Sequence, residues 1–78
     1  MVKSSLAKRI LAENLRRLRT EAGLSQEELA DRAGLHRTYV SSVERGHRNV
    51  TLENIFALAE ALGTTASVLV RLPTEGGK

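Results

Sequence analysis

A chain of 78 residues has room for one domain with a modest core, because small chains bury a smaller fraction of their surface than large ones. Cysteine is absent, which excludes disulfides and thiolate metal sites, and no apolar run is long enough for a membrane span or a signal peptide, so we expect a cytoplasmic protein. The net charge of +3 is uneven: residues 1–50 hold ten Lys and Arg against six Asp and Glu, and residues 51–78 hold two against three, so the first part should face a polyanion and the second part protein.

The first predicted helix covers about residues 5–22, where apolar residues recur at steps of four and three and so share one face. These residues are Ala7, Leu11, Leu15, Leu18 and Ala22. This segment and three later ones each end in a glycine, a residue that accepts the left-handed conformation found where helices stop. The four glycines are Gly23, Gly34, Gly46 and Gly63.

Two short helices follow, separated by a tight turn. Ser25 and Glu28 have the spacing of a capping box, which predicts a helix over residues 26–33. After the turn at Gly34, a third helix of about residues 37–45 buries two valines and presents a narrow polar outer face. That face carries Arg37, Thr38, Ser41 and Ser42.

The last two predicted helices are more apolar than one small core requires. Thr51 caps the fourth helix, and Thr64 or Thr65 opens a short fifth helix that ends near Arg71. A core of this size supplies little net stability, and a partner subunit is the remaining means of supplementing it. We therefore expect a homodimer interface on these two helices, formed by Ile55, Leu58, Val68 and Val70.

The pattern as a whole predicts an all-α protein. Residues 1–72 are expected to form one domain of five helices, and Pro73 to end the last helix. Residues 73–78 are expected to be a disordered tail.

A short helix, a turn with glycine and a second short helix form the pattern of the DNA-binding helix-turn-helix, here at residues 25–46. The stretch LSQEELADRAGLHRTYVSSVERGHRNVTLENIFALAEALG resembles the lambda-repressor and Cro-like family, also called XRE-type. Within it, RTYVSSVERGHRNVTLENI is most similar to the controller proteins of bacterial restriction-modification systems. The resemblance implies a five-helix homodimer that binds double-stranded DNA at an inverted repeat and controls a restriction gene, often together with its own gene.

The resemblance also implies roles for individual residues. The recognition helix would span residues 36–45, with Arg37, Thr38 and Ser42 at the positions that reach base edges. Ser41 and Ser42 are short, so both would reach bases only through close approach or water. A guanidinium can bond guanine O6 and N7 together, and threonine offers a hydroxyl and a methyl group, so the chemistry agrees. The DNA backbone would be contacted by Gln26, Tyr39, Arg45, Arg48 and Asn49. His36 departs from the family's usual Thr, Ser or Asp at the start of this helix and is expected to contact a phosphate instead of capping the helix.

Some assignments stay open. Tyr39 could contact the DNA or pack against the core. The resemblance gives Arg19 and Glu44 a structural ion pair, whereas Arg16 and Arg17 could contact the DNA backbone or simply solvate the first helix. We expect no metal, because His36 and His47 lie in separate loops without neighbouring carboxylates, and no cofactor or small-molecule ligand.

Other classes of function are less well supported. No phosphate-binding glycine loop, activated nucleophile or carboxylate pair indicates an enzyme. Tyr39 and Phe56 are the only aromatic residues, which disfavours RNA binding by stacking. The main alternative is an antitoxin that neutralises a toxin through its apolar helices and binds DNA secondarily.

Overall fold

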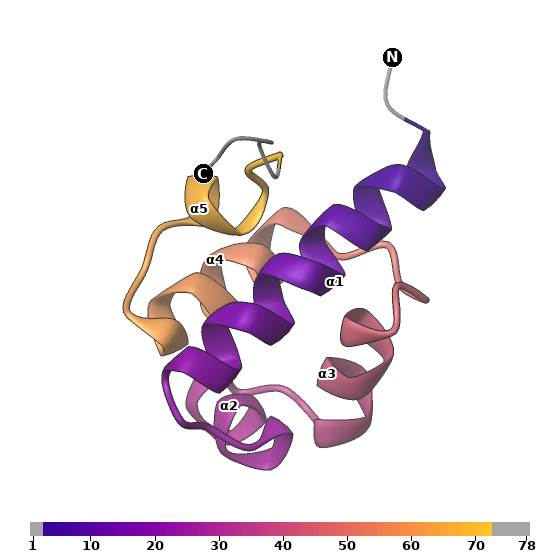
Figure 1. Cartoon of the computed structure of the whole chain (residues 1–78). Helices are drawn as coiled ribbons and strands as arrows, with labels where there is room; N and C mark the ends of the chain where they lie inside the picture. The colour runs from indigo at the N-terminus through magenta and orange to yellow at the C-terminus, as the bar shows by residue number, and fades with distance from the viewer. Residues whose placement is uncertain (1–2, 73–78) are drawn as a thin grey trace.

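The computed structural model describes residues 3–72, which form five α-helices and no strand (Figure 1). The helices are α1 (Ser4–Glu21), α2 (Gln26–Ala33), α3 (Arg37–Glu44), α4 (Leu52–Leu62) and α5 (Ala66–Leu69). The predicted all-α, five-helix fold is therefore confirmed. The predicted tail at residues 73–78 lies outside the described residues.

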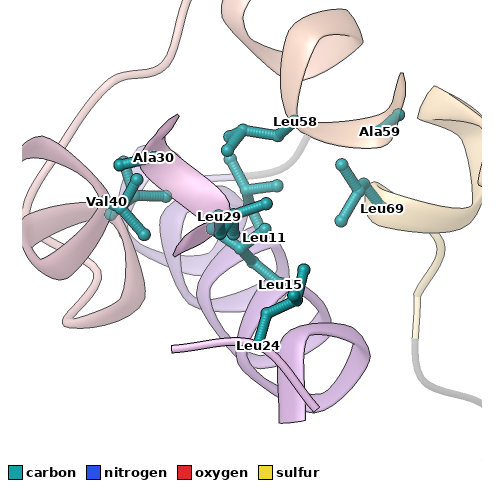
Figure 2. Close-up of a cluster of buried hydrophobic side chains, with 10 residues drawn as sticks. Leu11, Leu15, Leu24, Leu29, Ala30, Val40, Leu58, Ala59 and Leu69 are labelled. Atoms are coloured by element: carbon teal, nitrogen blue, oxygen red, sulfur yellow. The ribbon is translucent and has the colours of Figure 1, made fainter. Parts of the chain in front are cut away.

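The helices are held by one apolar core. The longest helix, α1, packs against α3 and α5, while α2 packs against α3 and α4, and α4 contacts α5. Figure 2 shows buried side chains converging on this centre, and α1 to α5 each contribute at least one. The cluster consists of Leu11, Leu15, Leu24, Leu29, Ala30, Val40, Val43, Leu58, Ala59 and Leu69.

The buried face of α1 differs from the predicted stripe. Ala7 and Ala22 are exposed, whereas Ile10 and Ala12 are buried. Because α1 is covered by α3 and by α5, its buried face is wider than a single row of residues at steps of three and four.

A buried asparagine ties the last helix to the first. The Nδ2 of Asn14 in α1 donates to the carbonyl oxygens of Leu69 and Arg71, each at 2.8 Å. These two carbonyls lie at and just after the end of the short α5, where no further helical turn supplies backbone donors. The hydrogen bonds explain a polar residue at a buried position, and they hold the end of α5, which lies at Leu69, two residues before Arg71.

The predicted capping box starts α2. The Ser25 hydroxyl accepts from the Glu28 N–H at 2.9 Å, and the Glu28 carboxylate accepts from the Ser25 N–H at 2.8 Å. The backbone N–H of Ser25, together with its side chain, lowers the pKa of Glu28. A carboxylate whose pKa is lowered by folding stabilises the folded state above its unfolded pKa, and this contribution disappears as the pH falls through the folded pKa.

We therefore expect Glu28→Gln to be less stable than the wild type at pH 7 and equally stable near pH 2. Glutamine preserves the acceptor of a capping box, so the substitution removes the charge alone. Thermal unfolding followed by circular dichroism at the two pH values measures the difference.

The matched control is Glu27→Gln in the same first turn of α2, whose side chain takes no part in the box. It reports the effect of one charge near the helix N-terminus without the hydrogen bond. An equal loss at pH 7 in both variants would show that the charge of Glu28 acts only through the helix dipole and does not strengthen its hydrogen bond to Ser25.

Candidate nucleic-acid interface

The turn between α2 and α3 depends on a glycine. Gly34 ends α2 with a φ of +74°, a conformation in which a side chain would be strained. Leu35 follows and packs partly buried against the core, and His36 is the N-cap of α3 but makes no side-chain capping bond. Histidine at this position leaves the first N–H groups of α3 unpartnered by the cap, and its side chain is exposed.

The first turn of α3 presents polar side chains to solvent. Arg37 and Thr38 are both exposed. Together with Gln26, Ser41 and Arg45 they line a concave region of about 270 Å³. The N-terminal ends of α2 and α3 thus share one polar hollow. A surface that contacts the phosphate backbone and base edges together needs polar groups side by side in this way.

Ser41 and Ser42 lie in different environments. Ser41 is partly buried, and its hydroxyl accepts a hydrogen bond from Nη1 of the exposed Arg45 one turn later. Ser42 is only 7% exposed, so the expectation that it points outward is wrong. Position 42 turns toward the loop after α3, where its hydroxyl donates to the Tyr39 carbonyl at 2.8 Å and accepts from the Arg48 Nε at 3.0 Å.

Arg48 is held on the surface by these neighbours. Its guanidinium lies 5.2 Å from the centre of the Tyr39 ring, and Ser42 accepts from its Nε. The arginine itself is exposed. Ser42 is therefore a residue that orients Arg48. Asn49, the next residue in the loop, is also exposed.

Tyr39 takes part in core packing and in a polar contact. Its ring is partly buried against the core cluster, and its hydroxyl accepts from Nδ2 of Asn54 in α4 at 3.1 Å. Sequence reasoning did not single out Asn54. Its backbone N–H donates to the capping hydroxyl of Thr51, so the cap of α4 also positions the side chain that holds Tyr39.

The structure contains the ion pair that the resemblance implied. Glu44 accepts from Nε and from Nη2 of Arg19, the second at 3.0 Å, and Arg19 also donates to the Leu24 carbonyl at 2.8 Å. The Glu44 hydrogen bond raises the pKa of Arg19. Nε2 of Gln26 donates to the same carboxylate at 3.0 Å, a contact that was not predicted. Glu44 thus links α1, α2 and α3 and orients Gln26 at the edge of the polar hollow.

The expected dimer residues divide into two groups. Leu58 is fully buried within the core of the chain, so it is not available to a partner, and its assignment to the interface is corrected. It faces inward because α4 is covered by α2 as well as by α5. Ile55 and Val68 are partly buried, and Val70 is 50% exposed. Other large apolar side chains that remain exposed are Leu6, Leu52, Phe56 and Leu72.

Residues 3–72 contain neither a cluster of metal-ligating side chains nor a membrane-spanning helix. No group of three or more His, Cys, Asp and Glu side chains in this range could hold a metal ion. None of the five helices is both long and apolar enough to cross a membrane.

The two short helices α2 and α3 flank a glycine turn, and α3 begins with exposed polar residues. This arrangement is the helix-turn-helix of a transcription regulator that binds DNA. Residues 15–69 match the helix-turn-helix family HTH_3, and the chain belongs to this XRE-like family.

Individual relatives place the chain close to restriction-modification controllers. The control protein C.SmaI of Serratia marcescens is 56% identical over 63 residues, which cover 81% of this chain and 75% of that protein. The crystal structure of the restriction-modification controller protein C.AhdI from Aeromonas hydrophila is similar with a TM-score of 0.78 and 52% identity, over 80% of this chain and 94% of that one. A hypothetical transcription factor from Neisseria superposes with a TM-score of 0.84 and 45% identity, over 94% of this chain and 84% of that one.

Proposed function

We propose that this protein is a homodimeric restriction-modification controller that binds an inverted-repeat operator, regulates its own gene and acts by binding without catalysis. The observation that carries the proposal is the exposed pair Arg37 and Thr38 at the start of α3, beside Gln26 in one polar hollow. C.SmaI is a control protein and C.AhdI is a restriction-modification controller protein, and these relatives support assigning the chain to a restriction-modification system.

Base reading is assigned to the first turns of α3. Arg37 is long enough to make a bidentate contact with guanine O6 and N7, and Thr38 can contact a neighbouring base or a thymine methyl group. Ser41 is short and bonded to Arg45, so it reaches a base through water. Ser42 contributes indirectly by orienting Arg48.

The proposed phosphate contacts surround the residues that read the bases. Gln26 lies at the first turn of α2, where free N–H groups and the helix dipole favour an anion. Arg45, Arg48 and Asn49 are exposed along the end of α3 and the following loop. His36 is exposed beside Arg37, and the Tyr39 ring lies next to the exposed Arg48 guanidinium, so both remain proposed backbone contacts.

The dimer is proposed to form on the apolar surface left by α4, α5 and the adjoining part of α1. Val70 and Leu72 line an apolar hollow of about 310 Å³ with Ile10 and Leu11. Ile55 borders a second hollow that also includes Val70. Association with a second copy of the chain would bury this exposed apolar area and stabilise the protein.

The proposed division of roles predicts different outcomes for two arginine variants on DNA from the region upstream of the protein's own gene. Arg37→Ala is expected to lose about 1–3 kcal/mol of discrimination per half-site, or roughly 5–150-fold, and to accept other bases at one position. Arg48→Ala is expected to weaken binding to all sequences alike and to flatten the salt dependence, because phosphates carry no base identity. Fluorescence anisotropy on operator and scrambled duplexes measures both effects.

The titration uses the purified chain alone, because a sufficient DNA-binding protein needs no second protein. Specific binding under these conditions separates the proposal from an antitoxin that requires a toxin partner. Equal proportional losses on operator and scrambled DNA in both variants would contradict the assignment of base reading to Arg37.

A further inference from the structure

A larger hollow lies beside α1 and carries a concentration of positive charge. It has a volume of about 710 Å³ and lies between the first four turns of α1 and the end of α3. These two helices pack against each other (Figure 1). Its cationic lining residues are Lys3, Arg9, Arg16 and Arg45, which are all exposed. We call this region the α1 groove.

The acidic residues of the α1 groove offset this charge only in part. Glu13 and Glu44 also line it, but Glu44 is already paired with Arg19. Within residues 3–72, the ion pairs closer than 4 Å are Arg17–Glu21 and Arg19–Glu44, so no carboxylate pairs with Arg9 or Arg16. The groove therefore presents cations that have no ion-pair partner within residues 3–72.

The spacing along α1 aligns these cations. Arg9 and Arg16 are seven residues apart, which places them on the same face two turns apart, about 10 Å along the helix axis. Between them lies the small, buried Ala12, which allows the end of α3 to approach. A DNA strand presents one phosphate per about 3.4 Å of its axis, so a row of this length can reach more than one phosphate.

The α1 groove is continuous with the proposed DNA-binding surface. Arg45 lines both this groove and the polar hollow that contains Arg37 and Thr38. A DNA backbone that passes the end of α3 beside Arg45 would therefore continue along Arg16 and Arg9.

We infer that the α1 groove binds backbone phosphates outside the base pairs read by α3, with Arg9 and Arg16 as the principal contacts. The inference rests on the proposed function and extends its footprint. Guanidinium groups match phosphate oxygens in geometry and charge. No aromatic side chain lines the groove, which disfavours stacking of unpaired bases, and its high charge is unlike the core of a protein interface.

The test compares the double variant Arg9→Gln/Arg16→Gln with the matched control Arg17→Gln/Arg32→Gln, which removes the same charge at exposed positions outside the groove. The probes are two duplexes taken from the upstream site located by footprinting. One ends at the outer edges of the half-sites, and the other extends about one helical turn further on each side.

The wild type and the control are expected to bind the extended duplex about tenfold more tightly than the short one, and the double variant to bind both equally. On the extended duplex, the slope of log K against log salt should become shallower by about 0.9 for each phosphate that the double variant no longer neutralises. Arg9, Arg16 and Arg32 are exposed and Arg17 is exposed over half of its side chain, so thermal unfolding should show each variant folded.

Two outcomes would overturn the inference alone: a wild type that binds both duplexes equally, or a double variant that keeps the wild-type preference and salt slope. In either case Arg37→Ala would still lose base discrimination, and the proposed function would stand. A wild type that binds no upstream site specifically would overturn the proposed function and this inference together. A groove that serves an acidic protein surface would give the first of these results.

Discussion

Glu44→Ala is expected to reduce the free energy of unfolding by about 3–5 kcal/mol, the cost of breaking a buried charge pair by removing one partner. The Arg19 side chain is 13% exposed and that of Glu44 is 4% exposed. Without the carboxylate, Arg19 retains the Leu24 carbonyl as its hydrogen-bond acceptor, and Gln26 loses its partner. Small domains are stable by roughly 5–15 kcal/mol, so the variant should approach the limit of folding.

Urea denaturation followed by circular dichroism measures this loss. The matched control is Glu21→Ala, which removes the exposed partner of Arg17 at 3.8 Å and should cost about 0–1 kcal/mol. A double substitution, Arg19→Met/Glu44→Leu, should recover much of the stability, because apolar residues of similar size need no partner. Equal losses for Glu44→Ala and Glu21→Ala would show that burial adds nothing to the Arg19–Glu44 pair.

The second large effect concerns the operator and rests on the proposed homodimer. Two recognition helices related by a two-fold axis enter successive major grooves on one face of the duplex, so the half-site centres should lie about 10 base pairs, or roughly 34 Å, apart. Inserting five base pairs between them turns one groove to the opposite face. We expect binding to weaken on the order of 100-fold, because one half-site supplies about half of the specific free energy.

Mobility-shift titration on three duplexes makes this test quantitative. An insertion of five base pairs outside the half-sites keeps their spacing and should leave binding unchanged. An insertion of ten base pairs between them returns the second groove to the same face and should restore part of the affinity if the dimer or the DNA can adjust. Undiminished affinity after the central five-base-pair insertion would contradict the two-groove arrangement.

Local patterns in the sequence determined most of the fold. The Ser25–Glu28 spacing and the glycine at position 34 fixed where α2 begins and ends, because a cap and a left-handed residue act on neighbouring backbone groups. The exposed position of Arg37 and Thr38 likewise follows from the valines that α3 buries. The Arg19–Glu44 pair required the resemblance to a family, since its partners are 25 residues apart.

The tertiary structure alone decided which side chains are free to act. Periodicity placed Ser42 on the outer face and Leu58 on an open surface, yet the loop carrying Arg48 covers the first and α2 with α5 encloses the second. The sequence did not predict the α1 groove either, because Arg16 and Arg45 are far apart in sequence. They line the same hollow only because α1 packs against α3. A residue's own helix determines the direction of its side chain, but only the packing of distant segments determines what that side chain meets.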